Sequence, residues 1–220
     1  MSKKTLTIEG ITFPKFSKGS SKRNFRLMFY IAYKDADGKN KTVIVTKPAS
    51  GQWQWKKSDK DFYFPEANDL GDSIELDTSV LRFADKGFKE EDYKITEIDG
   101  KLSSVTVQFV DVYDASPLDF FKQKILPQVL EELKKIGFNP IDLVPLPGVV
   151  TGIIKDKIKI EDLAGKVEDY LKEEGKDKLL HRVSAKYKKG DSLTASGEKE
   201  WEDDKTGTYA VTIGIEDSEE

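Results

Sequence analysis

The sequence predicts a mainly β protein, an antiparallel β-sandwich with a helical insertion at about residues 116–175 before the last two strands. Segments with alternating apolar and polar residues, separated by Gly, Asn and Asp, fill the first half and recur near the C-terminus. Between them, two segments carry apolar residues at three- and four-residue steps, the period of an amphipathic helix. Short, regularly spaced strands of this kind are typical of a sandwich.

The strands of the first half are read from alternation and turn residues. The clearest runs from Phe25 to Tyr33, where apolar residues occupy every second position. Asp37-Gly38 is a favoured hairpin turn, so the chain should return as a strand directly after it. The polar residues 48–60 are expected to form a loop. In order, the strands are expected at 6–11, 25–34, 42–47, 62–64, 73–77, 80–83, 93–98 and 102–113.

The helical insertion follows the last of these strands. Ser116 can cap a helix, and Pro117 suits its first turn because the missing N–H costs nothing there. The helical spacing then predicts one helix that ends at Gly137 and a second one at about residues 160–174. The apolar stretch 141–154 between them is expected to be a buried connector, or alternatively a loop that inserts into a lipid or a partner.

Two strands, at about residues 181–187 and 209–215, are expected to close the chain, with the polar residues 190–205 as a loop between them. They should return to the sheet that the first half begins. Since no repeat or proline-rich linker divides the chain, a single domain is expected. Its parts are a β-rich part (1–113), the helical insertion (114–176), the closing strands (177–215) and an acidic tail (216–220).

Composition excludes several classes of function. The 220 residues contain no cysteine, which excludes a disulfide framework, a thiolate nucleophile and sulfur-ligated zinc. No apolar run is long enough to span a bilayer as a helix, and no apolar signal segment follows Met1. We therefore expect a protein of the cytoplasm, or one exported without a visible signal peptide, and we expect no cofactor.

Positive charge is concentrated near the N-terminus. Residues 1–60 hold 14 Lys and Arg against 4 Asp and Glu, whereas residues 61–220 hold 22 against 36. Either the two parts interleave their charges on one surface, or a basic face binds an anionic partner. That partner would be a protein or another anionic surface; nucleic acid is less favoured, and peripheral membrane contact stays open. The partner-binding residues would be Lys15, Lys18, Lys22, Arg23 and Arg26.

Trp53 and Trp55, followed by Lys56 and Lys57, are a second candidate for partner contact. In an extended segment, residues two apart lie on the same side, so the two rings could form an aromatic platform. The alternative is that they cover an edge of the core.

Several aspartates are candidates for binding calcium. Asp35-Ala36-Asp37-Gly38 begins like a calcium loop, but the later ligands of an EF-hand are missing, so a hairpin turn explains it better. The stretch 107–120 resembles the strand-and-loop segment of C2 domains, β-sandwiches whose aspartates bind calcium and which commonly dock on membranes. The resemblance implies a metal site formed by Asp35, Asp37, Asp111, Asp114 and Asp119.

The chain departs from the C2 pattern in this stretch. Its aspartates are three and five residues apart, where the family has a closer pair, and Tyr113 and Ser116 stand where acids would be needed. Helix capping by Ser116 and Asp119 explains these residues without a metal. We therefore predict that the chain binds no metal.

Catalysis has little support in the sequence. His181 is the only histidine, and its apolar strand face favours a packed residue over a general base. The sequence contains no phosphate-binding glycine loop, no His-Glu-x-x-His, no nucleophile elbow and no dinucleotide fingerprint. We predict a non-enzymatic binding or assembly module. The alternatives are a C2-like calcium- or lipid-binding domain and a hydrolase that uses two carboxylates.

Overall fold

The structure is a computed structural model, and it describes residues 3–12, 22–47, 53–56, 61–63, 74–75, 80–81, 93–111, 131, 144–146, 149–152, 164–165, 168, 178–201 and 205–218. The strands of this part are β1 (Lys3–Thr12), β2 (Lys22–Asp35), β3 (Asn40–Lys47), β4 (Trp53–Lys56), β5 (Asp61–Tyr63), β6 (Ile74–Glu75), β7 (Val80–Leu81), β8 (Lys94–Asp111), β9 (Val144–Leu146), β10 (Val149–Gly152), β11 (Lys178–Lys186), β12 (Ser192–Trp201) and β13 (Lys205–Ser218).

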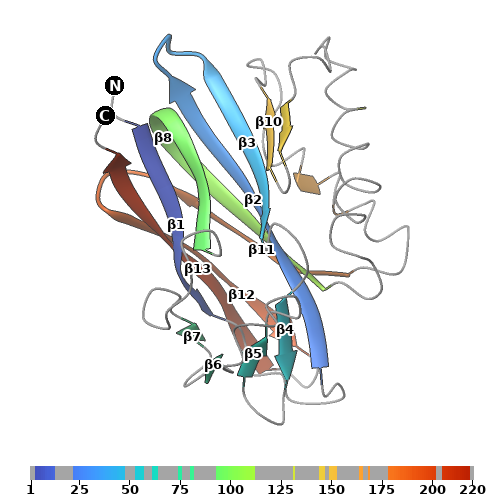
Figure 1. Cartoon of the computed structure of the whole chain (residues 1–220). Coiled ribbons are helices and arrows are strands. Elements are labelled where there is room, and N and C mark those ends of the chain that lie inside the picture. Colours follow the sequence, from blue (N-terminus) through green and yellow to red (C-terminus); the bar gives the residue numbers. More distant parts are fainter. Residues whose placement is uncertain are drawn as a thin grey trace.

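These strands form one antiparallel, hydrogen-bonded sheet (Figure 1). Its main order is β12-β13-β1-β8-β2-β3-β10-β9, while β11 pairs with β8 and β4 pairs with β2. The predicted mainly β class is confirmed. The closing strands do return to the sheet of the first half, since β13 pairs with β1 and β11 pairs with β8.

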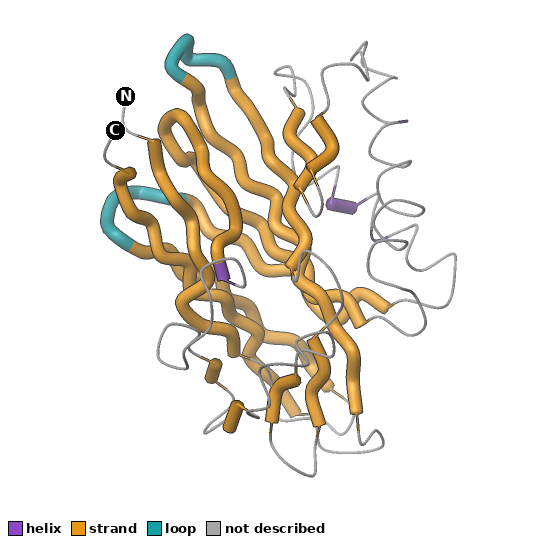
Figure 2. The backbone as a smooth tube through the Cα atoms, in the orientation of Figure 1, coloured by secondary structure: helices purple, strands orange, loops and turns teal. Residues whose placement is uncertain are grey.

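β8 joins the two halves of the sheet. Its residues 94–99 pair with β1, whereas residues 100–111 pair with β2. The change falls at Gly100, where φ is 155° and a Cβ atom would lie 2.1 Å from the carbonyl oxygen of Lys34. The predicted sandwich of two sheets is therefore wrong. The strands form one continuous sheet that curls into a half-barrel (Figure 2).

The core lies inside this curl, between the two halves. It is one cluster of apolar side chains from β1, β2, β3, β8, β11, β12 and β13. Phe109 of β8 and Tyr209 of β13 meet there edge to face, with ring centroids 5.1 Å apart. The alternation predicted for β2 is confirmed, because its core residues are Phe25, Leu27, Phe29 and Ile31.

The outer face of β2, β3 and β8 is also buried over much of its area. Ala164, from the connection between β10 and β11, is fully buried against it. Cover on both faces explains why the neighbours Phe109 and Val110 are both buried. The buried residues of this outer face include Arg26, Met28, Tyr30, Ile44, Thr46, Gln108 and Val110.

Two predicted loops are wrong, and the predicted connector contains a hairpin. Residues 190–205 contain β12, which pairs with β13 along its whole length. Residues 48–60 contain β4, and the apolar stretch 141–154 contains the hairpin of β9 and β10, which pairs with β3. β12 escapes recognition because it is an edge strand in the described sheet. Among its residues 192–199, whose burial the structure describes, only Leu193, Ala195 and Gly197 are partly or fully buried.

The predicted helices of the insertion lie outside the described residues, except for residues 131, 164–165 and 168. Within the described residues, no helix is long and apolar enough to cross a membrane.

Candidate functional site

β2 and β4 bring together the two groups of residues predicted to contact a partner. Arg23 lies directly opposite Trp55, and Lys22 lies opposite Lys56. Residues that face each other in an antiparallel pair are close neighbours on one face of the sheet, and successive residues alternate between the faces. Lys22 and Lys56 therefore share one face of this ladder, whereas Arg23 and Trp55 share the other. Cationic and aromatic positions that are far apart in the sequence therefore stand side by side. We call these four positions the β2/β4 ladder site.

The other tryptophan of β4, Trp53, has a different neighbour. Trp53 lies opposite Phe25, whose side chain belongs to the core. Because opposite positions share a face, position 53 is at the core side of this ladder. This register agrees with the interpretation in which the tryptophan pair covers an edge of the core.

The remaining predicted cations are placed elsewhere. Arg26 is fully buried on the outer face of β2, so it belongs to no exposed basic surface. Lys15 and Lys18 lie outside the described residues. Of the predicted basic group, the structure therefore places only Lys22 and Arg23 next to the tryptophan strand.

The predicted calcium ligands do not converge where the structure describes them. Asp35 pairs with Gly100, whereas Asp111 pairs with Phe25 at the other end of the β2/β8 ladder. At about 3.3 Å per residue the two aspartates are on the order of 30 Å apart, too far to share one ion. Asp114 and Asp119 lie outside the described residues, within which no group of three or more His, Cys, Asp or Glu could hold a metal ion.

Asp35 instead organises the hairpin between β2 and β3. Its Oδ1 accepts a hydrogen bond from the Lys39 backbone at 2.8 Å, and its Oδ2 lies 3.0 Å from Lys41 Nζ. Burial acts to raise the pKa of Asp35, but the hydrogen bonds from Lys41 and Lys39 outweigh it and lower that pKa. Asp37 forms an exposed ion pair with Lys39 at 3.3 Å. The predicted hairpin turn is confirmed.

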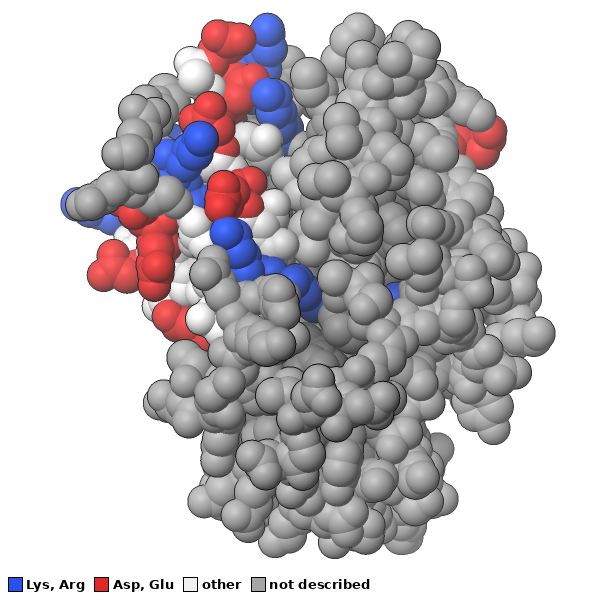
Figure 3. All heavy atoms as spheres, viewed as in Figure 1, with Lys and Arg blue, Asp and Glu red and all other residues white. Residues whose placement is uncertain are grey.

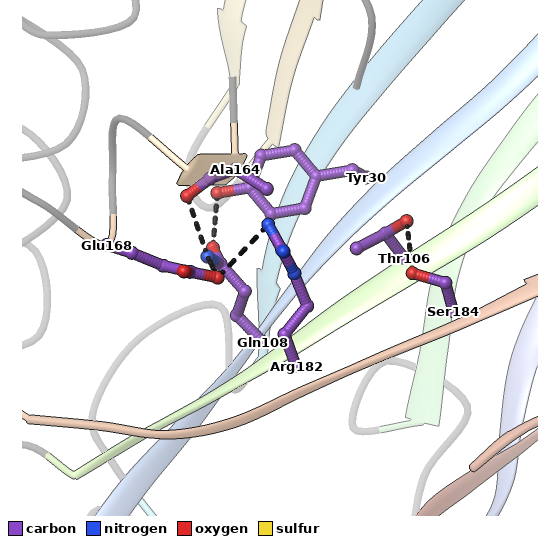
Figure 4. Close-up of polar contacts among 7 residues, drawn as sticks. All are labelled: Tyr30, Thr106, Gln108, Ala164, Glu168, Arg182 and Ser184. Carbon is purple, nitrogen blue, oxygen red and sulfur yellow. Dashed lines mark hydrogen bonds and ion pairs between the residues drawn. The ribbon is translucent and has the colours of Figure 1, made fainter. Parts of the chain in front are cut away.

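A polar network that the sequence analysis missed lies on the outer face of the sheet (Figure 4). The Tyr30 hydroxyl donates to Gln108 Oε1 at 2.5 Å. Gln108 Nε2 donates to the Ala164 carbonyl oxygen at 3.0 Å and to Glu168 Oε1 at 3.2 Å. Glu168 Oε1 also pairs with Arg182 Nη1 at 3.2 Å.

This network ties the connection between β10 and β11 to the sheet. Burial raises the pKa of Tyr30, so its hydroxyl stays protonated and acts as a donor. Loss of one member would leave buried polar atoms without partners, which costs about 1–3 kcal/mol for each. The available sequence signal was Gln108 between Val107 and Phe109, a polar residue within a strand that is apolar on both faces.

His181 lies beside this network in the sequence but faces the core. Its ring centroid is 5.1 Å from that of Tyr209. A Cβ atom on Gly197 would lie 2.8 Å from His181 Nε2, so the glycine leaves space for the imidazole. Burial lowers the pKa of His181, and the positive charges of Lys199 and Arg182 lower it further, against the opposing effect of Glu168. The expectation of a packed histidine agrees with this environment.

The folding stability should fall as the pH is lowered below about 6.5, because His181 then gains a proton more readily in the unfolded chain than in the folded one. The loss ends below the lowered pKa of the folded state. Urea unfolding at a series of pH values would measure it, with His181→Gln as the control. The carboxylates titrate in both proteins. Equal pH dependence in both would therefore contradict the attribution of this loss of stability to His181.

The site must be interpreted from this chain's own residues. No family model, curated protein or solved structure matches the chain.

Proposed function

We propose that the protein is a non-enzymatic binding or assembly module that recognises a protein or another anionic partner. The observation that carries the proposal is the β2/β4 ladder site, where Lys22 stands opposite Lys56 and Arg23 opposite Trp55. Cations accelerate the encounter with an anionic partner. Arg and Trp are the residue types most enriched among those that dominate protein interfaces.

The charge distribution also supports this proposal. The excess of cations within residues 1–60 contrasts with the net charge of −4 for the whole chain. A basic region on a protein that is acidic overall favours a bounded anionic surface on the partner, because a long polyanion would also meet the acidic regions.

The proposal includes the helical insertion expected at residues 116–175. The buried outer face of β2 and β8 needs a second layer, and Ala164 and Glu168 lie against that face. Amphipathic helices with apolar stripes would supply such a layer. In this arrangement the insertion supports the sheet and leaves the β2/β4 ladder site for the partner.

The test begins with isolation of the native partner on the immobilised full chain and continues with measured rates. In the double variant Lys22→Glu and Arg23→Glu, the association rate should fall by about tenfold at low salt, with a much smaller change in the dissociation rate. This difference should shrink as salt is added, because exposed charges are screened.

The matched control is the double variant Lys3→Glu and Lys39→Glu, which changes the net charge equally at two exposed positions away from this ladder. An equal loss of rate in the control would show a general charge effect. That result, or an unchanged rate in the Lys22 and Arg23 variant, would refute the ladder site as the contact.

A further inference from the structure

A second cationic surface lies on the outer face of β2, β8 and β11, at the end away from the buried polar network. The three strands place their residues in aligned rows across this face. From the network outward, the rows are Tyr30, Thr106 and Ser184, then Ala32, Ser104 and Lys186, then Lys34 and Lys101. We call Lys34, Lys101 and Lys186 the outer lysine cluster.

The cover on this face ends before the outer lysine cluster. Tyr30 is fully buried and Thr106 nearly so, whereas Ser184 is exposed and hydrogen-bonded to Thr106 at 2.9 Å (Figure 4). The three lysines of the cluster are all exposed. The sheet therefore presents a cationic, hydroxyl-bearing surface next to the covered region.

The lysines of this cluster form no ion pairs with the described carboxylates. No ion pair or side-chain hydrogen bond links Lys34, Lys101 or Lys186 to another described residue. Lys34 and Lys101 stand directly opposite each other, an arrangement that destabilises a sheet unless an anion lies between them. Lys188 and Lys189 follow Lys186 and are exposed as well, which adds to the positive potential.

The spacing of the cluster suits an extended acidic segment. Lys34 and Lys101 are on neighbouring strands, about 5 Å apart in the backbone. Lys186 lies opposite Ser104, three residues further along β8, which is roughly 10 Å away. These cations span more than one small anion, whereas acids at alternate positions of an extended peptide lie on one side about 7 Å apart. Ser104 and Ser184 can donate further hydrogen bonds to carboxylates.

The charged residues around the outer lysine cluster favour a short acidic segment over a long polyanion as its ligand. On the face drawn in Figure 3, Lys and Arg are interspersed with Asp and Glu. Glu97 and Asp99 are exposed residues of β8, and they precede Lys101 in the same strand. A duplex or long polyphosphate that extends beyond the cluster would meet these carboxylates, whereas a segment of a few residues that runs from Lys101 toward Lys186 leads away from them.

We propose that the outer lysine cluster binds an extended segment rich in Asp and Glu on a partner protein. This inference rests on the proposed function, in that it assumes an anionic partner, but it places a contact at a different site from the β2/β4 ladder. The two sites share no residue, so they can be tested separately.

The experiment measures binding of a labelled synthetic peptide of alternating Glu and Ser to the full chain by fluorescence anisotropy at low salt. Its Gln-Ser counterpart should bind much more weakly. The triple variant Lys34→Gln, Lys101→Gln and Lys186→Gln should weaken binding of the acidic peptide about tenfold, since several exposed charge contacts are lost together. Heparin and duplex DNA should compete less well than the acidic peptide itself.

The control variant is Lys3→Gln with Lys39→Gln, two exposed lysines outside both sites, which should leave peptide affinity unchanged. Unchanged peptide binding in the triple variant overturns the proposed segment site, even if the native partner still depends on Lys22 and Arg23. Equal binding of the Glu-Ser and Gln-Ser peptides, or stronger competition by DNA or heparin, also overturns it. A partner whose binding depends on the cluster but not on Lys22 and Arg23 would refute the β2/β4 ladder site alone.

Discussion

Replacing Gly100 by alanine is expected to reduce the free energy of unfolding by about 3 kcal/mol. The added Cβ atom would lie 2.1 Å from the Lys34 carbonyl oxygen, at a φ of 155° that L-residues rarely adopt. The Cβ position is fixed by the backbone and the atom it meets is a backbone oxygen, so no side-chain rotation can relieve the contact. β8 would have to shift where it passes from β1 to β2. Urea unfolding of the purified variant would measure the loss.

Gly38→Ala is the matched control for this substitution. Gly38 also has a positive φ, of 76°, but a Cβ atom there would meet nothing within 4 Å. Only the conformational cost remains, about 1 kcal/mol. Equal losses at the two glycines would show that close approach of β2 and β8 is not what requires Gly100.

Truncation of Phe109 to alanine should cost about 3–5 kcal/mol, because a buried aromatic ring is lost and the surrounding structure can collapse only in part. Phe109 is fully buried, and its ring meets Tyr209 edge to face at 5.1 Å. This contact links β8 to β13 across the core, so the loss should weaken the packing of one half of the sheet on the other. Calorimetry or urea unfolding would give the magnitude.

Two further variants show whether the loss belongs to that contact. Phe109→Leu keeps most of the apolar volume and should lose clearly less than the alanine variant. Ser103→Ala changes an exposed residue of the same strand and should lie within about 0.5 kcal/mol of the wild type. If Phe109→Ala were as stable as Ser103→Ala, Phe109 would not join the two halves as described.

Local sequence signals were sufficient where alternation and turn chemistry agree. The strand from Phe25 to Tyr33, the turn at Asp37-Gly38 and the returning strand form the β2/β3 hairpin, with a hydrogen bond of 3.0 Å from the Gly38 backbone to the Asp35 carbonyl oxygen. The core side of β2 was also predictable, because apolar residues occupy every second position from Phe25 to Tyr33.

Local signals failed where only pairing stabilises a segment. Tyr93 to Ile98 and Leu102 onward were expected as separate strands, yet β8 runs through Gly100 because β1 and β2 pair with its two parts in turn. β12 is polar on its exposed face, and its apolar pattern is too weak to be recognised without β13 beside it.

The candidate sites show the same division. Lys22, Arg23 and the tryptophan pair could be picked out by residue type, but their approach depends on the register of β2 with β4. The outer lysine cluster was missed because its three members come from three strands, and only the register of β8 with β2 and β11 places them on one face.

The sequence by itself determined the mainly β class, the β2/β3 hairpin and which residues of the clearest strands enter the core, because burial and turn geometry act over a few neighbouring residues. Only the tertiary structure decided that the two halves share β8, that Arg26 is buried and that Lys34, Lys101 and Lys186 lie on one face. These features depend on strand order and register, which are selected by the free energy of the whole sheet and its covering layer.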